Sequence, residues 1–387
     1  MPSDNAPLSA ETRRIILAAI LIISAVGMGL SLMLPLLSLE LERMGASSTL
    51  NGLNTAVGGI ANIIIAPLVP MLARRLGQKR FIALAIAVLI LSVLLFRLLP
   101  GIGPWFVLRF GFGAAIGALF VLSEFWITAS APEARRGTIM GIYATVLATG
   151  FAAGPAVLAL TGTVGWPPYL ACAALMLLAA LPLWITPALL PPIETSPHPR
   201  VLPLVRASPV ATLAALMFGA IESGSFSQFP IYGLRLGLGD TEAALLVTWT
   251  ALGNLLFQIP IGWLSDRMDR RKVLLGCALL GALGTGLMVL LPATSPGFLA
   301  LLFVWGGVTG AIYTVGLAHL GSRFSGGEIA VANAAFVMLY SAGMIVGPPI
   351  VGAAMDGLGT AGFPLGLGGL LAGYALLVGW RLLSQPR

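Results

Sequence analysis

The sequence predicts an all-α polytopic membrane protein with twelve transmembrane helices in two pseudo-symmetric halves of six. Three observations support this fold class. Apolar residues make up 58% of the 387 positions, charged residues make up 9%, and the mean hydropathy is +0.98. Apolar runs of membrane length recur along the chain, and parts of the chain repeat. Stacked membrane helices explain this composition, whereas a soluble domain of this size carries far more charge.

Each expected helix is an apolar run of about 20 residues, the length that crosses the hydrocarbon core of a bilayer. The first run, 15–39, ends after Pro35 at the polar residues 40–43. Since no Ala-x-Ala cleavage site accompanies it, we expect this helix to be retained. Five further runs complete the first half, residues 1–190: 50–73, 81–99, 104–129, 137–160 and 168–190.

The second half follows a change in composition. Residues 191–207 are rich in Pro and predict a cytoplasmic linker between the halves. Residues 208–387 then hold the other six expected helices: 209–232, 242–265, 273–291, 298–320, 329–354 and 363–383.

An internal repeat supports the division into halves. Two charged loops of the same length, 70–80 and 262–272, each join two apolar runs. The other matches are Asn62 with Asn254, and Gly150-x3-Gly154-Pro155 with Gly343-x3-Gly347-Pro348. Six helices per repeat give both halves the same orientation in the membrane.

The basic residues predict how the chain is oriented. If the helices alternate in direction, all but four of the 21 Lys and Arg fall at one membrane face. Arg43 and Arg235 fall at the opposite face, and Arg97 and Arg109 lie within spans. Cytoplasmic loops carry such an excess, so we expect both termini in the cytoplasm. The net charge of +7 therefore reflects topology and does not indicate a nucleic-acid partner.

Two acidic residues lie inside expected spans, away from the ends. Ionisable side chains at membrane depth are expensive, so each is a candidate for function. Glu222 is near the middle of 209–232, among glycines and serines, and predicts a substrate or proton site. The alternative is a protonated acid bonded to a neighbouring helix. Glu124 lies nearer the cytoplasmic end of its span, where a functional role and a structural role in the adjoining loop are both open.

Four further residues complete the candidate substrate and proton pathway. Arg109 is a cation within the span 104–129, although an arginine near an interface can also extend its head group into water. Tyr143, Asn62 and Asn254 are polar residues within spans. Membrane-embedded amides also bond across helices as structural contacts, and this alternative stays open for both asparagines.

The charged loop Gly262-Trp263-Leu264-Ser265-Asp266-Arg267-Met268-Asp269-Arg270-Arg271-Lys272 resembles the loop signature of the major facilitator superfamily. Its first copy has Pro70 in place of the glycine and Arg74 in place of the aspartate. The resemblance implies that the aspartate locks the halves in one state, which shifts that role to Asp266. The gating residues that it implies are Asp266, Arg267, Arg270 and Arg271, with Arg75 and Gly77 in the first copy.

Other motifs point to branches of the same superfamily. Arg109-x3-Gly113 resembles a motif whose arginine is linked with proton transfer. Gly150, Gly154 and Pro155 resemble the motif of its antiporters and are further expected gating residues. Gly150 and Gly154 also share a helix face, so tight packing is an alternative explanation. Glu124-Phe125-Trp126, followed by Arg135-Arg136-Gly137, is similar to the bacterial YcaD-like branch.

The leading functional hypothesis is a secondary transporter of the bacterial inner membrane that exports a small amphipathic compound in exchange for protons. Proton-coupled uptake of a metabolite is the alternative. An enzyme or a non-transporting sensor is disfavoured, since the two histidines are far apart and no sizeable soluble domain is expected. The expected partners are a small-molecule substrate, protons and lipid. We expect a monomer with no metal or cofactor.

Overall fold

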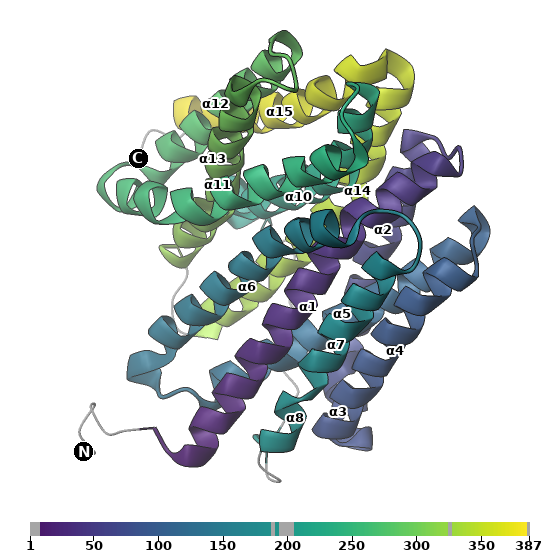
Figure 1. Cartoon of the computed structure of the whole chain (residues 1–387). Coiled ribbons are helices and arrows are strands. Elements are labelled where there is room, and N and C mark those ends of the chain that lie inside the picture. The colour runs from purple at the N-terminus through teal and green to yellow at the C-terminus, as the bar shows by residue number, and fades with distance from the viewer. Residues whose placement is uncertain (1–7, 187–189, 193–204, 324–326, 385–387) are drawn as a thin grey trace. The chain divides into compact units, whose positions relative to one another are not determined.

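The computed structural model describes residues 8–186, 190–192, 205–323 and 327–384, and these residues are largely helical (Figure 1). The helices up to residue 186 are α1 (Ala10–Arg43), α2 (Ser48–Ile65), η1 (Ala66–Leu68), α3 (Val69–Leu76), α4 (Gln78–Leu98), α5 (Ile102–Ser130), α6 (Glu133–Thr161), α7 (Pro167–Ala180) and α8 (Pro182–Ile185). The later helices are α10 (Pro209–Arg235), α11 (Asp240–Arg267), α12 (Arg270–Leu290), α13 (Pro296–Gly321), α14 (Gly327–Leu358), η2 (Gly359–Ala361) and α15 (Gly362–Ser384).

The predicted membrane spans are confirmed as helices. In the described ranges, 11 stretches are long and apolar enough to cross a membrane. The last of them, Val331–Ser384, contains most of α14 and all of α15, so each of the twelve expected spans has a helical counterpart. The all-α fold class is therefore confirmed.

Prolines move several helix boundaries from their expected positions. The expected span 50–73 is interrupted by η1, because Pro67 and Pro70 lack the N–H that an α-helix needs. Pro182 similarly separates α8 from α7. By contrast, α1 passes through Pro35 without a break and continues to Arg43. Much of the expected linker 191–207 lies outside the described residues, as do residues 187–189 of the preceding expected span.

Packing divides the chain into two compact units. The first unit comprises Met1–Met33 and Ala61–Ser196, and the second comprises Leu34–Ile60 and Pro197–Arg387. The segment Leu34–Ile60, here called the hairpin, contains the end of α1 and the start of α2, and it packs with the second unit. These units are defined by contacts within the structure and not by the sequence repeat. The division into halves around the linker 191–207 therefore stays a prediction.

The repeated glycine motif packs in the same way in both units. In the first unit, a Cβ on Gly150 or Gly154 of α6 would collide with the α1 backbone at Ser24 or Met28. In the second unit, a Cβ on Gly343 or Gly347 of α14 would collide with α10 at Leu216 or Ala220. Small residues thus let one helix backbone lie directly on another. Close packing accounts for both copies, and any role in antiport remains a prediction.

Candidate functional site

Glu222 lies in the middle of α10 and is held by a tyrosine from α14. The Tyr340 hydroxyl donates a hydrogen bond of 2.5 Å to Glu222 Oε2. The two helices can approach this closely because Gly219, three residues before Glu222, faces the carbonyl of Tyr340. The Glu222 side chain is partly buried, and it forms no ion pair with any of the described residues.

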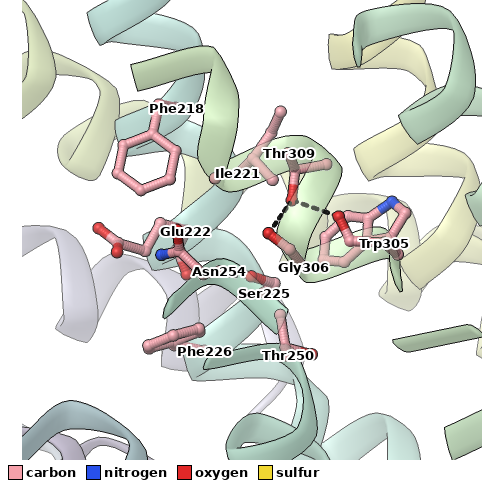
Figure 2. A pocket seen from close by; sticks show the side chains of 11 residues that line it. Phe218, Ile221, Glu222, Ser225, Phe226, Thr250, Asn254, Trp305, Gly306 and Thr309 are labelled. Carbon is pink, nitrogen blue, oxygen red and sulfur yellow. Dashed lines mark hydrogen bonds between the residues drawn. The ribbon is translucent and has the colours of Figure 1, made fainter. Parts of the chain in front are cut away.

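Glu222 also lines a small pocket inside the second unit (Figure 2). The pocket is formed by α10, α11 and α13, and its other lining residues are Phe218, Ile221, Ser225, Phe226, Thr250, Asn254, Trp305, Gly306, Thr309 and Gly310. The Thr309 hydroxyl is bonded to the carbonyls of Trp305 and Gly306, at 2.8 and 3.4 Å. The lining is therefore mostly apolar and aromatic, with one carboxyl and one amide.

Aromatic rings pack around the carboxyl. Phe218 stacks on Tyr340 with ring centroids 5.9 Å apart, and it contacts Tyr313 at 5.2 Å. Tyr313 in turn packs edge-on against Tyr340 and Phe336. These contacts hold the Tyr340 ring in place, so the direction of its hydrogen bond to Glu222 is set by packing.

The two repeated asparagines occupy equivalent places. Asn254 of α11 lies against Gly310 of α13, and its Oδ1 accepts a hydrogen bond of 3.1 Å from Gln258. Asn62 of α2 lies against Gly117 of α5 in the first unit. Each amide fills the space that a glycine leaves on the neighbouring helix. Both asparagines therefore have a packing role, and Asn254 is brought together with Glu222.

The remaining pathway candidates belong to the first unit. The Tyr143 hydroxyl is buried and lies 3.1 Å from the hydroxyl of Ser123, next to the exposed Glu124. Arg109 is only 3% exposed, and its Nη1 has no hydrogen-bond partner among the described residues. It shares a helix face with the buried Trp105 and Phe112. Arg109 therefore does not extend its head group to the protein surface.

The second charged loop contains the expected gating residues. Asp266 has a side chain that is 69% exposed and pairs with Arg270 at 3.3 Å. Asp269, by contrast, caps α12 by accepting a hydrogen bond from Arg271 N, and it also pairs with the Arg271 guanidinium at 2.9 Å. The Arg267 guanidinium lies over the Trp263 ring at 3.5 Å. The locking role of Asp266 remains a prediction.

The first copy of this loop is a sharper turn. Gly77 joins α3 to α4 with φ of +82°, a conformation that glycine adopts without a steric penalty. Arg75 is exposed in the last turn of α3.

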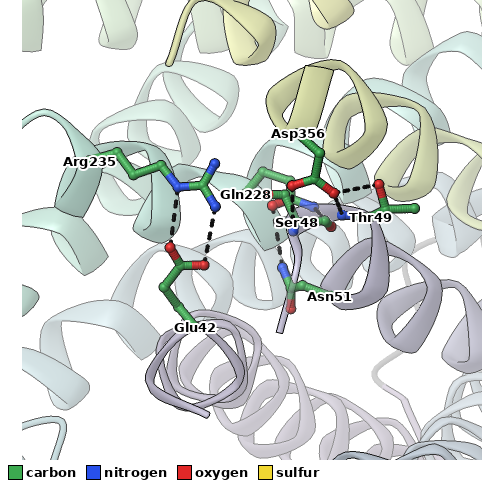
Figure 3. Close-up of polar contacts among 7 residues, drawn as sticks. All are labelled: Glu42, Ser48, Thr49, Asn51, Gln228, Arg235 and Asp356. Atoms are coloured by element: carbon green, nitrogen blue, oxygen red, sulfur yellow. Dashed lines mark hydrogen bonds and ion pairs between the residues drawn. The ribbon is translucent and has the colours of Figure 1, made fainter. Parts of the chain in front are cut away.

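Polar contacts tie the hairpin to α10, α11 and α14, and we call this set the hairpin clasp. Figure 3 shows its contacts with α10 and α14. Glu42 pairs with Arg235 through two hydrogen bonds of 3.2 and 3.4 Å. Asp356 of α14 accepts hydrogen bonds from Ser48 N at 2.9 Å, Thr49 N at 2.8 Å and Thr49 Oγ1 at 2.6 Å. The carboxylate thus caps the first turn of α2.

The clasp has further members. Arg43 pairs with Asp240 at the start of α11. In the buried part, Asn51 Nδ2 donates to Ser227 O at 3.1 Å, and Gln228 Nε2 donates to Ser48 O at 2.9 Å. The clasp was not anticipated from the sequence, because the partners of its contacts lie between 176 and 308 positions apart in the chain.

Comparison with known proteins identifies the family. Residues 17–244 and 211–387 both match the Major Facilitator Superfamily. The chain belongs to this superfamily. It is therefore a multi-pass membrane transporter and not an enzyme. In the described ranges, no group of three or more His, Cys, Asp and Glu residues could hold a metal ion.

Several relatives of this superfamily member can be named. The Bacillus subtilis (strain 168) protein described as the uncharacterized MFS-type transporter YfkF is 29% identical over 338 residues, which cover 85% of each chain. Escherichia fergusonii YcaD, also described as uncharacterized, is 23% identical over 74% of this chain and 75% of its own. The resemblance to the YcaD-like proteins is thus confirmed.

Solved structures share the fold of this transporter. A point mutant of the nucleoside transporter NupG superposes with a TM-score of 0.75 at 14% identity, covering 96% of this chain and 99% of its own. A bacterial homolog of the human lysosomal transporter Spinster, in an inward-facing and occupied conformation, gives a TM-score of 0.72 at 16% identity, covering 97% and 96%. At these identities the likeness concerns the fold alone.

Proposed function

We propose that this protein is a secondary active transporter that exports a small amphipathic compound in exchange for protons. The observation that carries the proposal is the Glu222 carboxyl, which is bonded to Tyr340 and opens onto a mostly apolar pocket. The transporter acts as a monomer in the inner membrane, with both termini in the cytoplasm.

The surroundings of Glu222 support a proton site. An ionised carboxylate without a nearby cation is costly in an apolar setting, and a bound proton removes that cost. Coupling then requires that the affinity for the proton differs between the two access states, since a ligand shifts an equilibrium only by its differential affinity. A carboxyl held by one hydroxyl at the wall of a pocket changes its hydration when the pocket opens or closes.

The same pocket supports an amphipathic substrate. Phe218, Phe226 and Trp305 offer apolar surface, while Asn254 and Thr250 offer hydrogen-bonding groups. Binding pockets for small molecules combine these features, with a few polar groups fixing the orientation of an otherwise apolar ligand.

The test uses purified protein in proteoliposomes. A compound is first selected from a panel of amphipathic molecules by its ability to raise the melting temperature, since binding to the folded state stabilises it. Glu222→Gln keeps the shape of the side chain but cannot titrate. We expect this variant to lose accumulation driven by a pH gradient and to retain downhill exchange of the selected compound. Glu242→Gln, an exposed acid in the same unit, serves as the control.

Full pH-driven accumulation by Glu222→Gln would remove Glu222 from the coupling mechanism. The direction of transport is tested with the same compound in vesicles of opposite orientation. Export in exchange for protons predicts that an outwardly directed proton gradient, with an acidic lumen, drives accumulation in everted vesicles. Proton-coupled uptake predicts instead that an inwardly directed gradient drives accumulation in right-side-out vesicles.

A further inference from the structure

A second pocket in the second unit lies at the opposite end of α10 from the hairpin clasp. It is formed where α10 begins, α12 begins, and α13 and α15 end. The residues that line it are Pro209, Val210, Arg271, His319, Arg323 and Arg381. We call it the basic pocket, because four of its six lining residues are Arg or His.

The positive charge of the basic pocket is only partly offset. The nearby acid is Asp269, which is engaged by Arg271 through hydrogen bonds of 3.2 and 2.9 Å to its guanidinium. Asp266 pairs with Arg270 instead. Among the described residues, no acidic side chain forms an ion pair with Arg323 or Arg381. The pocket therefore has an excess of positive charge.

Some hydrogen-bond donors in and beside the basic pocket have no acceptor among the described residues. Arg381 Nε is shielded from solvent and has no hydrogen-bond partner within the described part of the chain. The hydroxyl of Ser208, a residue that is 0% exposed, likewise has no partner among the described residues, and Ser208 directly precedes the pocket-lining Pro209. Arg323 donates to Ala207 O at 3.0 Å through one of the five N–H groups of its guanidinium. Buried donors without partners are rare in folded proteins and call for an explanation.

Two helix N-termini add to the positive potential. α10 begins at Pro209 and α12 begins at Arg270, and each N-terminus carries a partial positive charge. Asp269 already caps α12, whereas Ser208 makes no side-chain capping bond to α10. Exposed N–H groups at a helix N-terminus, next to arginines, form a favourable environment for an anion.

We propose that the basic pocket binds a phosphate group. Guanidinium groups match the geometry of phosphate oxygens and can form paired hydrogen bonds with them. The rule that basic residues collect at the cytoplasmic face accounts for their presence at this end of the helices, but not for their convergence on one hollow. The phosphate belongs either to the head group of an anionic phospholipid or to a free phosphate anion.

The test measures the melting temperature of the full chain in nanodiscs. One arm compares phosphatidylcholine with a mixture of phosphatidylcholine and phosphatidylglycerol, and the other adds inorganic phosphate to phosphatidylcholine nanodiscs. At about ten times the dissociation constant, we expect an increase of about 2 °C. An increase with phosphatidylglycerol alone assigns the lipid head group, and an increase with inorganic phosphate assigns the free anion.

Variants separate specific binding from general attraction to charge. Arg323→Gln combined with Arg381→Gln should remove the increase, whereas Arg74→Gln combined with Arg75→Gln should retain it, because both of these arginines are exposed on α3. If the double variant folds poorly, Arg381→Gln alone should reduce the increase. Equal increases in wild type and in the pocket variants would overturn the proposal, as would the absence of an increase with both probes.

Discussion

Tyr340 of α14 donates its hydroxyl hydrogen to Glu222 of α10 over 2.5 Å, at a point where Gly219 lets the two helices touch. This bond joins the acid to the helix that carries the glycine motif Gly343-x3-Gly347. A small shift of α14 along α10 would therefore alter the surroundings of the carboxyl. Under the proposed function, this hydrogen bond would link helix packing to proton binding at Glu222.

Replacing Tyr340 with Phe tests that link. Tyr340→Phe keeps the ring and its stacking on Phe218 but removes the donor. A hydrogen bond to a charged group contributes about 1.5–3 kcal/mol, so the ratio of pH-driven to downhill transport should fall by about tenfold or more. Tyr374→Phe is the matched control, because its hydroxyl bonds to Val210 O, away from this pocket. An unchanged ratio in Tyr340→Phe would show that the bond has no part in coupling.

The hairpin clasp predicts the effect of Asp356→Asn. The substitution removes the negative charge that faces the N-terminus of α2, which is worth about 1 kcal/mol by analogy with other helix caps. We expect faster alkylation of a cysteine introduced by Ala56→Cys, a site on α2 that is 4% exposed and is not a member of the clasp, in a background with Cys172→Ala and Cys277→Ala. Thr49→Val removes only the side-chain bond and should have a smaller effect. Identical alkylation rates with and without Asp356→Asn would contradict the prediction.

The glycine contact between α14 and α10 predicts a loss of stability for Gly347→Ala. The added Cβ would meet the backbone of Ala220, and overpacking of this kind costs about 1–3 kcal/mol. Gly286→Ala on α12 is the control, since no atom lies within 4 Å of its added Cβ. Melting temperatures of the two variants should therefore differ, with Gly347→Ala lower. Equal melting temperatures would mean that α14 shifts to accommodate the added methyl group without losing stability.

Substitutions of Asp269 and Asp266 should affect different properties, stability for Asp269 and transport for Asp266. Asp269→Asn should lower stability by about 0.3–1 kcal/mol because it removes the ion pair with Arg271 and the negative charge at the N-terminus of α12, although the amide oxygen can still accept the capping bond. Asp266→Asn, at an exposed position, should impair transport with little change in melting temperature. The reverse pattern, with Asp266→Asn the less stable variant, would assign the structural role to Asp266.

The role of Asp269 should also depend on pH. The hydrogen bonds from the Arg271 side chain lower the pKa of Asp269 below its usual value of 3.8. A lowered pKa in the folded state means that the stabilisation is present above pH 3.8 and is lost as the pH falls below it. The difference in melting temperature between wild type and Asp269→Asn should therefore shrink in that range, and a difference that grows there would contradict this assignment.

Labelling from outside intact cells tests the orientation. Cysteines introduced by Arg135→Cys and Lys272→Cys should remain unlabelled by a membrane-impermeant reagent. Thr294→Cys, in the exposed loop between α12 and α13, should be labelled. The basic asymmetry of the sequence predicts this result. Labelling of either basic loop, with Thr294→Cys protected, would reverse the topology.

The sequence by itself determined the fold class, because the cost of exposing backbone groups to lipid leaves few choices for long apolar runs. It also indicated Glu222 as a candidate functional residue, since an ionisable side chain in the middle of a membrane span is energetically costly. The matched positions of Asn62 and Asn254 indicated that the chain repeats, and both asparagines indeed lie against a glycine of a neighbouring helix. Composition and periodicity are enough for such conclusions.

Only the tertiary structure decided which residues meet. Tyr340 is 118 positions from Glu222, and Asp356 is 308 positions from Ser48. Neither pairing follows from local spacing, because it depends on how far one helix slides and turns against another. The same holds for Arg323 and Arg381. They line one pocket because the ends of α13 and α15 lie close together. The apolar composition of each segment determines that it forms a membrane helix. The side-chain volumes at the helix contacts determine how the helices align with one another, and this alignment brings the residues of each site together.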